Sequence, residues 1–194
     1  MQPDDLILPA AFFAGTAYFF ERSDRWSSSY FGGPSEVKIS RASKHPASLH
    51  HILTIGCREL PDLGKFSLKL PLFYGLRYSG CTLRYRKIDT HNMEVFEMAP
   101  DSAMSDWPYP SYPPYLPYLP LRVSRSEQCD FREFSGLSCQ PSWEVSAKSL
   151  IVVVPASPVL GFSIWGPSGD AEGTQIIFEC DLANGVVQAF NQCA

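Results

Sequence analysis

The sequence predicts a β-rich α+β fold, a single domain that covers residues 1–194. We expect mainly antiparallel strands, a few short helices and a strap rich in proline and tyrosine. The first observation is the strict alternation of apolar and polar residues across residues 66–78, which is typical of a half-buried strand. The second is a series of short apolar runs separated by turn residues, with no convincing long amphipathic helix among them.

The first predicted elements lie in an apolar and aromatic run near the N-terminus. Residues 10–20 are apolar almost throughout and have Gly15 in the middle, which predicts a buried strand or a strand pair, although periodicity alone does not distinguish these from a core helix. Residues 36–41 alternate, with Val37 and Ile39 on one face, and predict a short strand.

The alternating segment at residues 66–78 is expected at a sheet edge or beside a bulge, because it contains Pro71 and Gly75. Residues 122–142 are mixed and polar, and no element is assigned to them. Two hairpins are expected, one from residues 82–88 and 93–98 and one from residues 174–180 and 185–190. The other expected strands are short runs bounded by turn residues, at 49–56, 150–154 and 159–165.

The strap is defined by residues 107–121, which read WPYPSYPPYLPYLPL. Tyrosine, proline and a mostly apolar column each recur every third position, and three residues per turn is the repeat of a polyproline II helix. Because proline restricts the backbone, such a segment loses little entropy on docking. We expect a rigid strap on one domain. Its tyrosines either pack on the domain's own sheet or face another protein.

Composition excludes several classes of protein. The net charge is −4 and no basic run is present, which argues against nucleic-acid binding. The six cysteines contain no C-x-x-C pair, so we expect free thiols in the cytoplasm. The apolar residues 6–20 follow Asp4 and Asp5, the wrong charge for a signal peptide, and they are too short to span a bilayer comfortably. No membrane association is expected.

Catalytic motifs are not found in the sequence. It contains no G-x-S-x-G elbow, no H-E-x-x-H and no P-loop. His50 and His51 are adjacent, so in a strand they point to opposite faces and cannot easily share a metal. We therefore predict no catalytic residue, no cofactor and no metal site.

Four segments resemble the YwqG-like family of bacterial domains of unknown function. They are SSYFGGP at residues 28–34, LHHILTIGCRELPDLG at 49–64, LPLFYGLRY at 70–78, and the terminal W-G-x-x-G hairpin within 164–193. The strap is not part of that family's pattern. The resemblance implies a β-rich α+β fold without established catalytic residues. Members of such families occur beside bacterial toxins as immunity proteins.

These observations predict a non-enzymatic immunity protein that neutralises a toxin by direct contact. Nuclease toxins tend to be basic, which the acidic balance of this chain would match. A rival hypothesis is a small-molecule binder or hydrolase with a pocket near His50, His51 or Cys57, and a third is a purely structural subunit. The predicted partner contacts are Asp101, Asp106, Trp107, Tyr109, Tyr112, Tyr115 and Tyr118.

Overall fold

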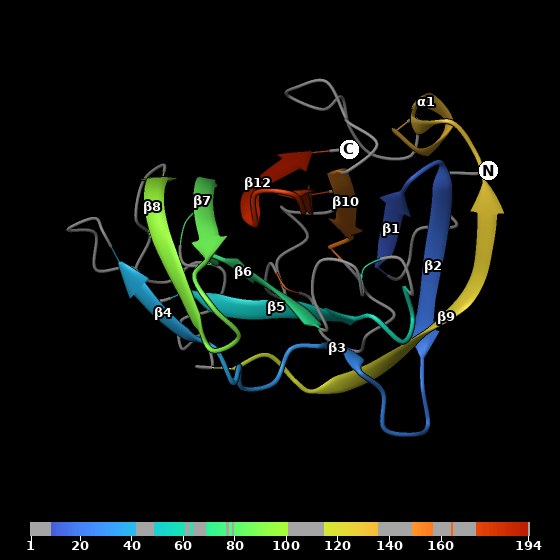
Figure 1. The fold of residues 1–194 in the computed structure, drawn as a ribbon, viewed down its shortest axis with the longest axis horizontal. Helices are drawn as coiled ribbons and strands as arrows, with labels where there is room; N and C mark the ends of the chain where they lie inside the picture. Colours follow the sequence, from blue (N-terminus) through green and yellow to red (C-terminus); the bar gives the residue numbers. More distant parts are fainter. Residues whose placement is uncertain are drawn as a thin grey trace.

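Strands dominate the fold in the computed structural model, which describes residues 9–41, 49–60, 63, 69–76, 78, 80–100, 115–135, 149–156, 164 and 174–193. Twelve of them form one sheet in the order β4-β8-β7-β12-β11-β10-β1-β2-β9-β3-β5-β6 (Figure 1). The elements are β1 (Ala10–Phe13), β2 (Thr16–Arg22), β3 (Ser29–Phe31), β4 (Lys38–Arg41), β5 (His50–Gly56), β6 (Lys69–Tyr74), β7 (Cys81–Lys87), β8 (Asn92–Pro100), β9 (Leu119–Gln128), α1 (Phe131–Ser135), β10 (Ser149–Val154), β11 (Thr174–Asp181) and β12 (Val186–Cys193).

Tight turns create the hairpins that the sequence predicts. The run at residues 10–20 is a strand pair, because Ala14 and Gly15 both adopt positive φ, 50° and 79°, and reverse the chain between β1 and β2. The predicted hairpins β7–β8 and β11–β12 are also confirmed. Asp89 and Asp181 close their loops by accepting hydrogen bonds from the residues that follow them.

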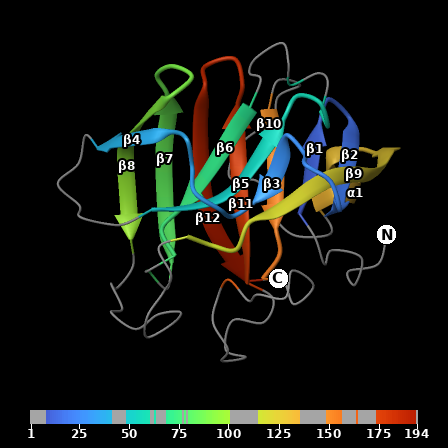
Figure 2. The ribbon, with the colours of Figure 1, turned by 90° about the horizontal axis from the view of Figure 1, so that it is seen from below.

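The sheet curls so that its β3-β5-β6 end lies across the face of its middle strands. Figure 2 shows β3, β5 and β6 crossing in front of β7, β12, β11 and β10. The Tyr85 hydroxyl, on β7, accepts a hydrogen bond from the Phe73 N–H of β6, at 3.0 Å. The Tyr74 hydroxyl donates to Asn191 Oδ1 of β12, at 2.9 Å. The main core lies between these layers, and β6 is an edge strand, as Pro71 predicts.

A smaller apolar cluster lies on the opposite face, where α1 covers β1. Phe131 and Phe134 lie with their ring centroids 5.4 Å from that of Phe12. Asp130 and Glu133 form a capping box, in which each carboxylate accepts the other residue's N–H.

The β-rich part of the predicted fold class is confirmed, but the α+β expectation of several helices is wrong for the described residues, which contain this one helix of five residues. The physical reason is that the curl lets the sheet cover its own inner face, so a helical layer is not needed there.

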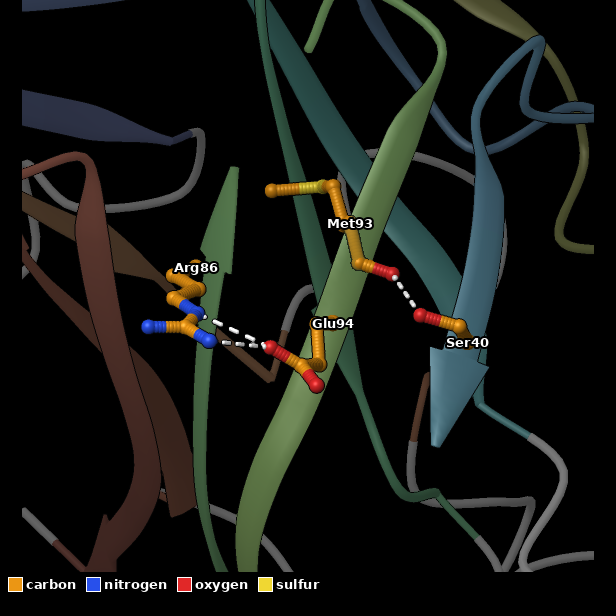
Figure 3. Close-up of polar contacts among 4 residues, drawn as sticks. All are labelled: Ser40, Arg86, Met93 and Glu94. Carbon is orange, nitrogen blue, oxygen red and sulfur yellow. Dashed lines mark hydrogen bonds and ion pairs between the residues drawn. The ribbon is translucent and has the colours of Figure 1, made fainter. Parts of the chain in front are cut away.

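At the other end of the sheet, β4 and β8 form the one parallel pair among the described pairs. The Ser40 hydroxyl donates to the Met93 carbonyl of β8, at 3.2 Å, beside the forked ion pair of Arg86 with Glu94 (Figure 3). The sheet is therefore mixed, although its other pairs are antiparallel.

The C-terminal end of the strap is part of the sheet, since residues 119–121 begin β9 and lie between β2 and β3. Pro120 is tolerated there because its carbonyl accepts the Ser23 N–H, at 2.9 Å, on the β2 side. Within an antiparallel strand, the N–H and C=O of one residue point to the same side. The N–H that Pro120 lacks would therefore have pointed toward the chain just beyond the last residue of β2.

Two further predictions lie outside the described residues: most of the strand at 159–165 and residues 107–114 of the strap. Among the helical residues that the structure describes, no segment has the length and apolar character needed to cross a bilayer.

Candidate functional site

The described end of the strap presents its tyrosines outward. Tyr115 is 59% exposed and Tyr118 is 49% exposed, whereas Leu116 between them is 2% exposed. The period of three therefore separates an outward tyrosine column from an inward leucine column over these residues. Both tyrosine side chains are therefore accessible from solvent.

A glycine turn forms the seat on which this end of the strap rests. Gly32 and Gly33, directly after β3, have φ values of 62° and 73°. The Gly33 N–H donates to the Leu116 carbonyl, at 2.8 Å. A Cβ atom on Gly32 would lie 2.2 Å from the Pro117 carbonyl oxygen, and one on Gly33 would lie 3.0 Å from the Tyr118 ring. Only glycine permits both this backbone and this approach.

Tyr30 joins the strap tyrosines in what we call the aromatic patch: Tyr30, Tyr115 and Tyr118. The rings of Tyr30 and Tyr118 lie 5.2 Å apart, and the ring of the buried His51 lies 5.4 Å from that of Tyr30. Tyr30 belongs to β3, so one short strand carries both a member of the patch and, directly after it, the glycine seat.

His51 supports the seat from the core side. Its Nδ1 lies 2.9 Å from the Gly32 carbonyl oxygen, to which it donates, so Nε2 accepts from the Thr54 hydroxyl, at 2.8 Å. Burial lowers the pKa of His51, although hydrogen bonds to backbone carbonyls oppose the shift. The neutral imidazole is therefore the form that the fold accommodates.

We expect the folded state to lose stability as the pH falls below about 6.5, the pKa of an unfolded histidine. Between the lowered folded pKa and that value, the unfolded chain binds the extra proton and the folded chain does not. His51→Gln keeps a donor for the Gly32 carbonyl but cannot titrate. Thermal unfolding measured across this pH range should therefore show a shallower pH dependence in that variant.

His91, an exposed histidine in the β7–β8 loop, provides the control. His91→Gln should retain the pH dependence of the wild type. An unchanged slope in His51→Gln would contradict the assignment of the transition to His51.

A carboxylate holds the other end of β3. Glu59 accepts hydrogen bonds from the hydroxyls of Ser27, at 2.8 Å, Ser28, and Ser29, at 3.1 Å. The Ser29 hydroxyl also accepts the Gly56 N–H, at 2.9 Å. These contacts, the Glu59 clasp, join the β2–β3 loop to the turn after β5. Because β3 has three residues, side-chain contacts at both ends contribute much of what fixes its position.

One pocket lies between the segment before β4, strands β5 and β6, and the β7–β8 loop. Its cavity volume is about 60 Å³, and its lining includes Glu36, Lys69, Lys87, Asp89 and His91. Ligand pockets are typically about 300 Å³ or larger, so this one is small for an organic substrate. A shallower hollow of about 370 Å³ lies beside the end of β8, and the described residues that line it include no carboxylate, lysine or histidine.

The residues of the rival hydrolase hypothesis lie outside the two pockets described above. His50 and His51 are buried on β5, Cys57 lies in the following turn, and none of the three lines either pocket. In the part of the chain that the structure describes, no three His, Cys, Asp or Glu side chains are placed to hold a metal ion. The cysteines at 57, 81, 129 and 180 are free thiols.

The other predicted contacts, Asp101, Asp106, Trp107, Tyr109 and Tyr112, lie outside the described residues. Tyr30, His51 and Glu59 were not predicted to support the strap. The SSYFGGP segment that carries part of the family resemblance contains two of the three serines of the clasp, Tyr30 and the glycine seat. This motif was therefore the signal in the sequence that could have pointed to the site.

The chain matches no family model, and no curated protein or solved structure shows significant similarity to it. Its resemblance to the YwqG-like family therefore stays a prediction.

Proposed function

We propose that this protein is a cytoplasmic, non-enzymatic bacterial immunity protein that binds a toxin through the aromatic patch and the adjoining strap. The observation that carries the proposal is the outward exposure of Tyr115 and Tyr118 on a segment seated on Gly32 and Gly33. The choice of a toxin as the partner rests on the resemblance to the YwqG-like family.

Physical chemistry favours this surface for protein recognition. Tyrosine contributes a large ring and a hydroxyl while few side-chain torsions need ordering, and it is enriched at interface hot spots. The proline-restricted backbone and the seat at Gly33 lower the ordering cost of binding. The net charge of −4 favours a basic partner, as many nuclease toxins are.

Replacement of Tyr115 and Tyr118 by alanine should weaken binding to the toxin encoded by the neighbouring gene. Loss of two hot-spot side chains is expected to cost about 2 kcal/mol or more, roughly 30-fold in Kd. The measurements are calorimetric titration with the purified toxin and survival of cells that co-express both proteins.

Phe96→Ala is the matched control, since Phe96 is a 37% exposed aromatic residue on β8, outside the patch. It should leave both binding and protection unchanged. The proposal fails if the wild type neither binds nor protects, or if the tyrosine variant protects fully.

A further inference from the structure

The far half of β9 has an open edge. β3 pairs with β9 only through Ser29–Phe31, opposite residues 119–121, whereas β2 pairs with β9 as far as Gln128. Within the described ranges, no strand pairs with the outer edge of residues 122–128. Figure 1 shows this half of β9 along the outer rim of the ribbon, and its side chains are exposed apart from the half-buried Val123.

The hydrogen-bonding direction along this edge follows from one contact. The Cys129 N–H donates to the Gly15 carbonyl, on the β2 side. Backbone groups of an antiparallel strand alternate in direction, so those of Glu127 and Arg125 also face β2. The N–H and C=O of Ser126 and Gln128 therefore point outward.

The charged residues on this stretch have opposite signs at equal distances on the two sides of Ser126. Arg125 and Glu127 flank it, and Arg122 and Asp130 lie four residues to either side. We propose that a second copy of this chain pairs with this edge, antiparallel, with the two-fold axis at Ser126.

In this register, Ser126 of each copy exchanges both of its outward backbone hydrogen bonds with the other. Arg125 of one copy then faces Glu127 of the other, twice per dimer. Within the chain, Arg125 Nε already lies 3.3 Å from Glu127 Oε1, so the four charges form one network. The same patch serves both copies, which closes the assembly as a dimer.

Charged residues often protect a strand edge from pairing. Here the charged residues favour one pairing register and do not prevent pairing altogether. An axis at Arg125 or at Glu127 would place like charges opposite each other, and the backbone groups of those two residues face β2. The register shift near Ser124 limits the regular stretch, so we expect a weak, concentration-dependent dimer. The aromatic patch is roughly 25 Å away along the strand and stays uncovered.

Sedimentation velocity over a range of concentrations tests the dimer with matched charge variants. Arg125→Glu and Glu127→Arg should each raise the dimer dissociation constant by roughly tenfold, because like charges then meet twice. The double variant R125E/E127R restores opposite charges and should recover the wild-type constant. Circular dichroism identifies any variant that fails to fold.

A cysteine pair tests the register independently of charge. Directly opposed residues have Cα atoms about 5.5 Å apart, within disulfide range, so Ser126→Cys should cross-link under mild oxidation. Gln128→Cys is the control, because its two copies would lie roughly 13 Å apart. Burial raises the pKa of the Cys129 thiol, which limits background reaction from the nearest native cysteine.

A wild type that remains monomeric at all concentrations would overturn the proposal. So would charge reversals that leave the dimer unchanged, a double variant that does not recover, or equal cross-linking at positions 126 and 128.

Discussion

Gly32→Ala is expected to destabilise the protein by roughly 3 kcal/mol. Part of this cost is backbone strain, because alanine is disfavoured at a φ of 62°. The rest is steric, since the new Cβ would lie 2.2 Å from the Pro117 carbonyl oxygen and 2.9 Å from Leu116 Cβ. The seat and the strap must separate to admit the methyl group. Chemical denaturation measures the loss.

Gly185→Ala separates the two contributions. Gly185 has a φ of 65°, nearly that of Gly32, but its added Cβ would meet nothing closer than Lys87 Cβ at 3.8 Å. This variant should lose only the backbone part, roughly 1 kcal/mol. If both variants lose equal stability, close packing between the seat and the strap is not the reason that position 32 requires glycine.

Gly32→Ala should also reduce toxin neutralisation if the aromatic patch is the binding surface. Displacing Leu116 and Pro117 would move Tyr115 and Tyr118, which follow the same backbone. Gly185 lies in the β11–β12 turn, so its variant should neutralise normally.

The hairpins could be predicted from the sequence because their signals are local. Asp89 and Asp181 form loop-closing hydrogen bonds with residues two or three positions away, and apolar runs flank each loop. Local turn chemistry therefore specified these pairs without knowledge of the rest of the sheet.

Strand β9 could not be predicted in this way. Its residues from Arg122 to Gln128 are nearly all polar and exposed, so no apolar alternation marks the strand. What holds it is the ladder with β2, together with contacts such as the Arg125 guanidinium, which lies 4.2 Å from the Phe19 ring centroid. Helix α1 did have a local signal, the Asp130–Glu133 capping box, but five residues are too few for helical periodicity.

The candidate site was predictable in part. The period of three placed Tyr115 and Tyr118 in one column, but it did not decide which way that column faces; the structure shows both side chains exposed. The seat was recognisable only as a turn, because its partner Leu116 is distant in sequence. Pairing of a short strand such as β3 depends on contacts of this long-range kind, from His51 at one end and Glu59 at the other.

Glu59→Ala is expected to destabilise the protein by roughly 3 kcal/mol. The substitution removes the acceptor for three serine hydroxyls, two of which belong to side chains that are 7% exposed and one to a side chain that is fully buried. Hydrogen bonds to a charged group are stronger than neutral ones, and the hydroxyls left behind lie largely away from water. Thermal and chemical unfolding measure the change.

Glu97→Ala provides the comparison. Glu97 forms an ion pair with Arg84 at 3.0 Å, but both side chains are at least 43% exposed. It should cost no more than about 0.5 kcal/mol. Equal losses in the two variants would mean that the clasp is no stronger than an exposed ion pair.

If the clasp does hold β3, Glu59→Ala should also weaken toxin binding, because Tyr30 and the glycine seat depend on that strand. Glu97→Ala should leave binding unchanged.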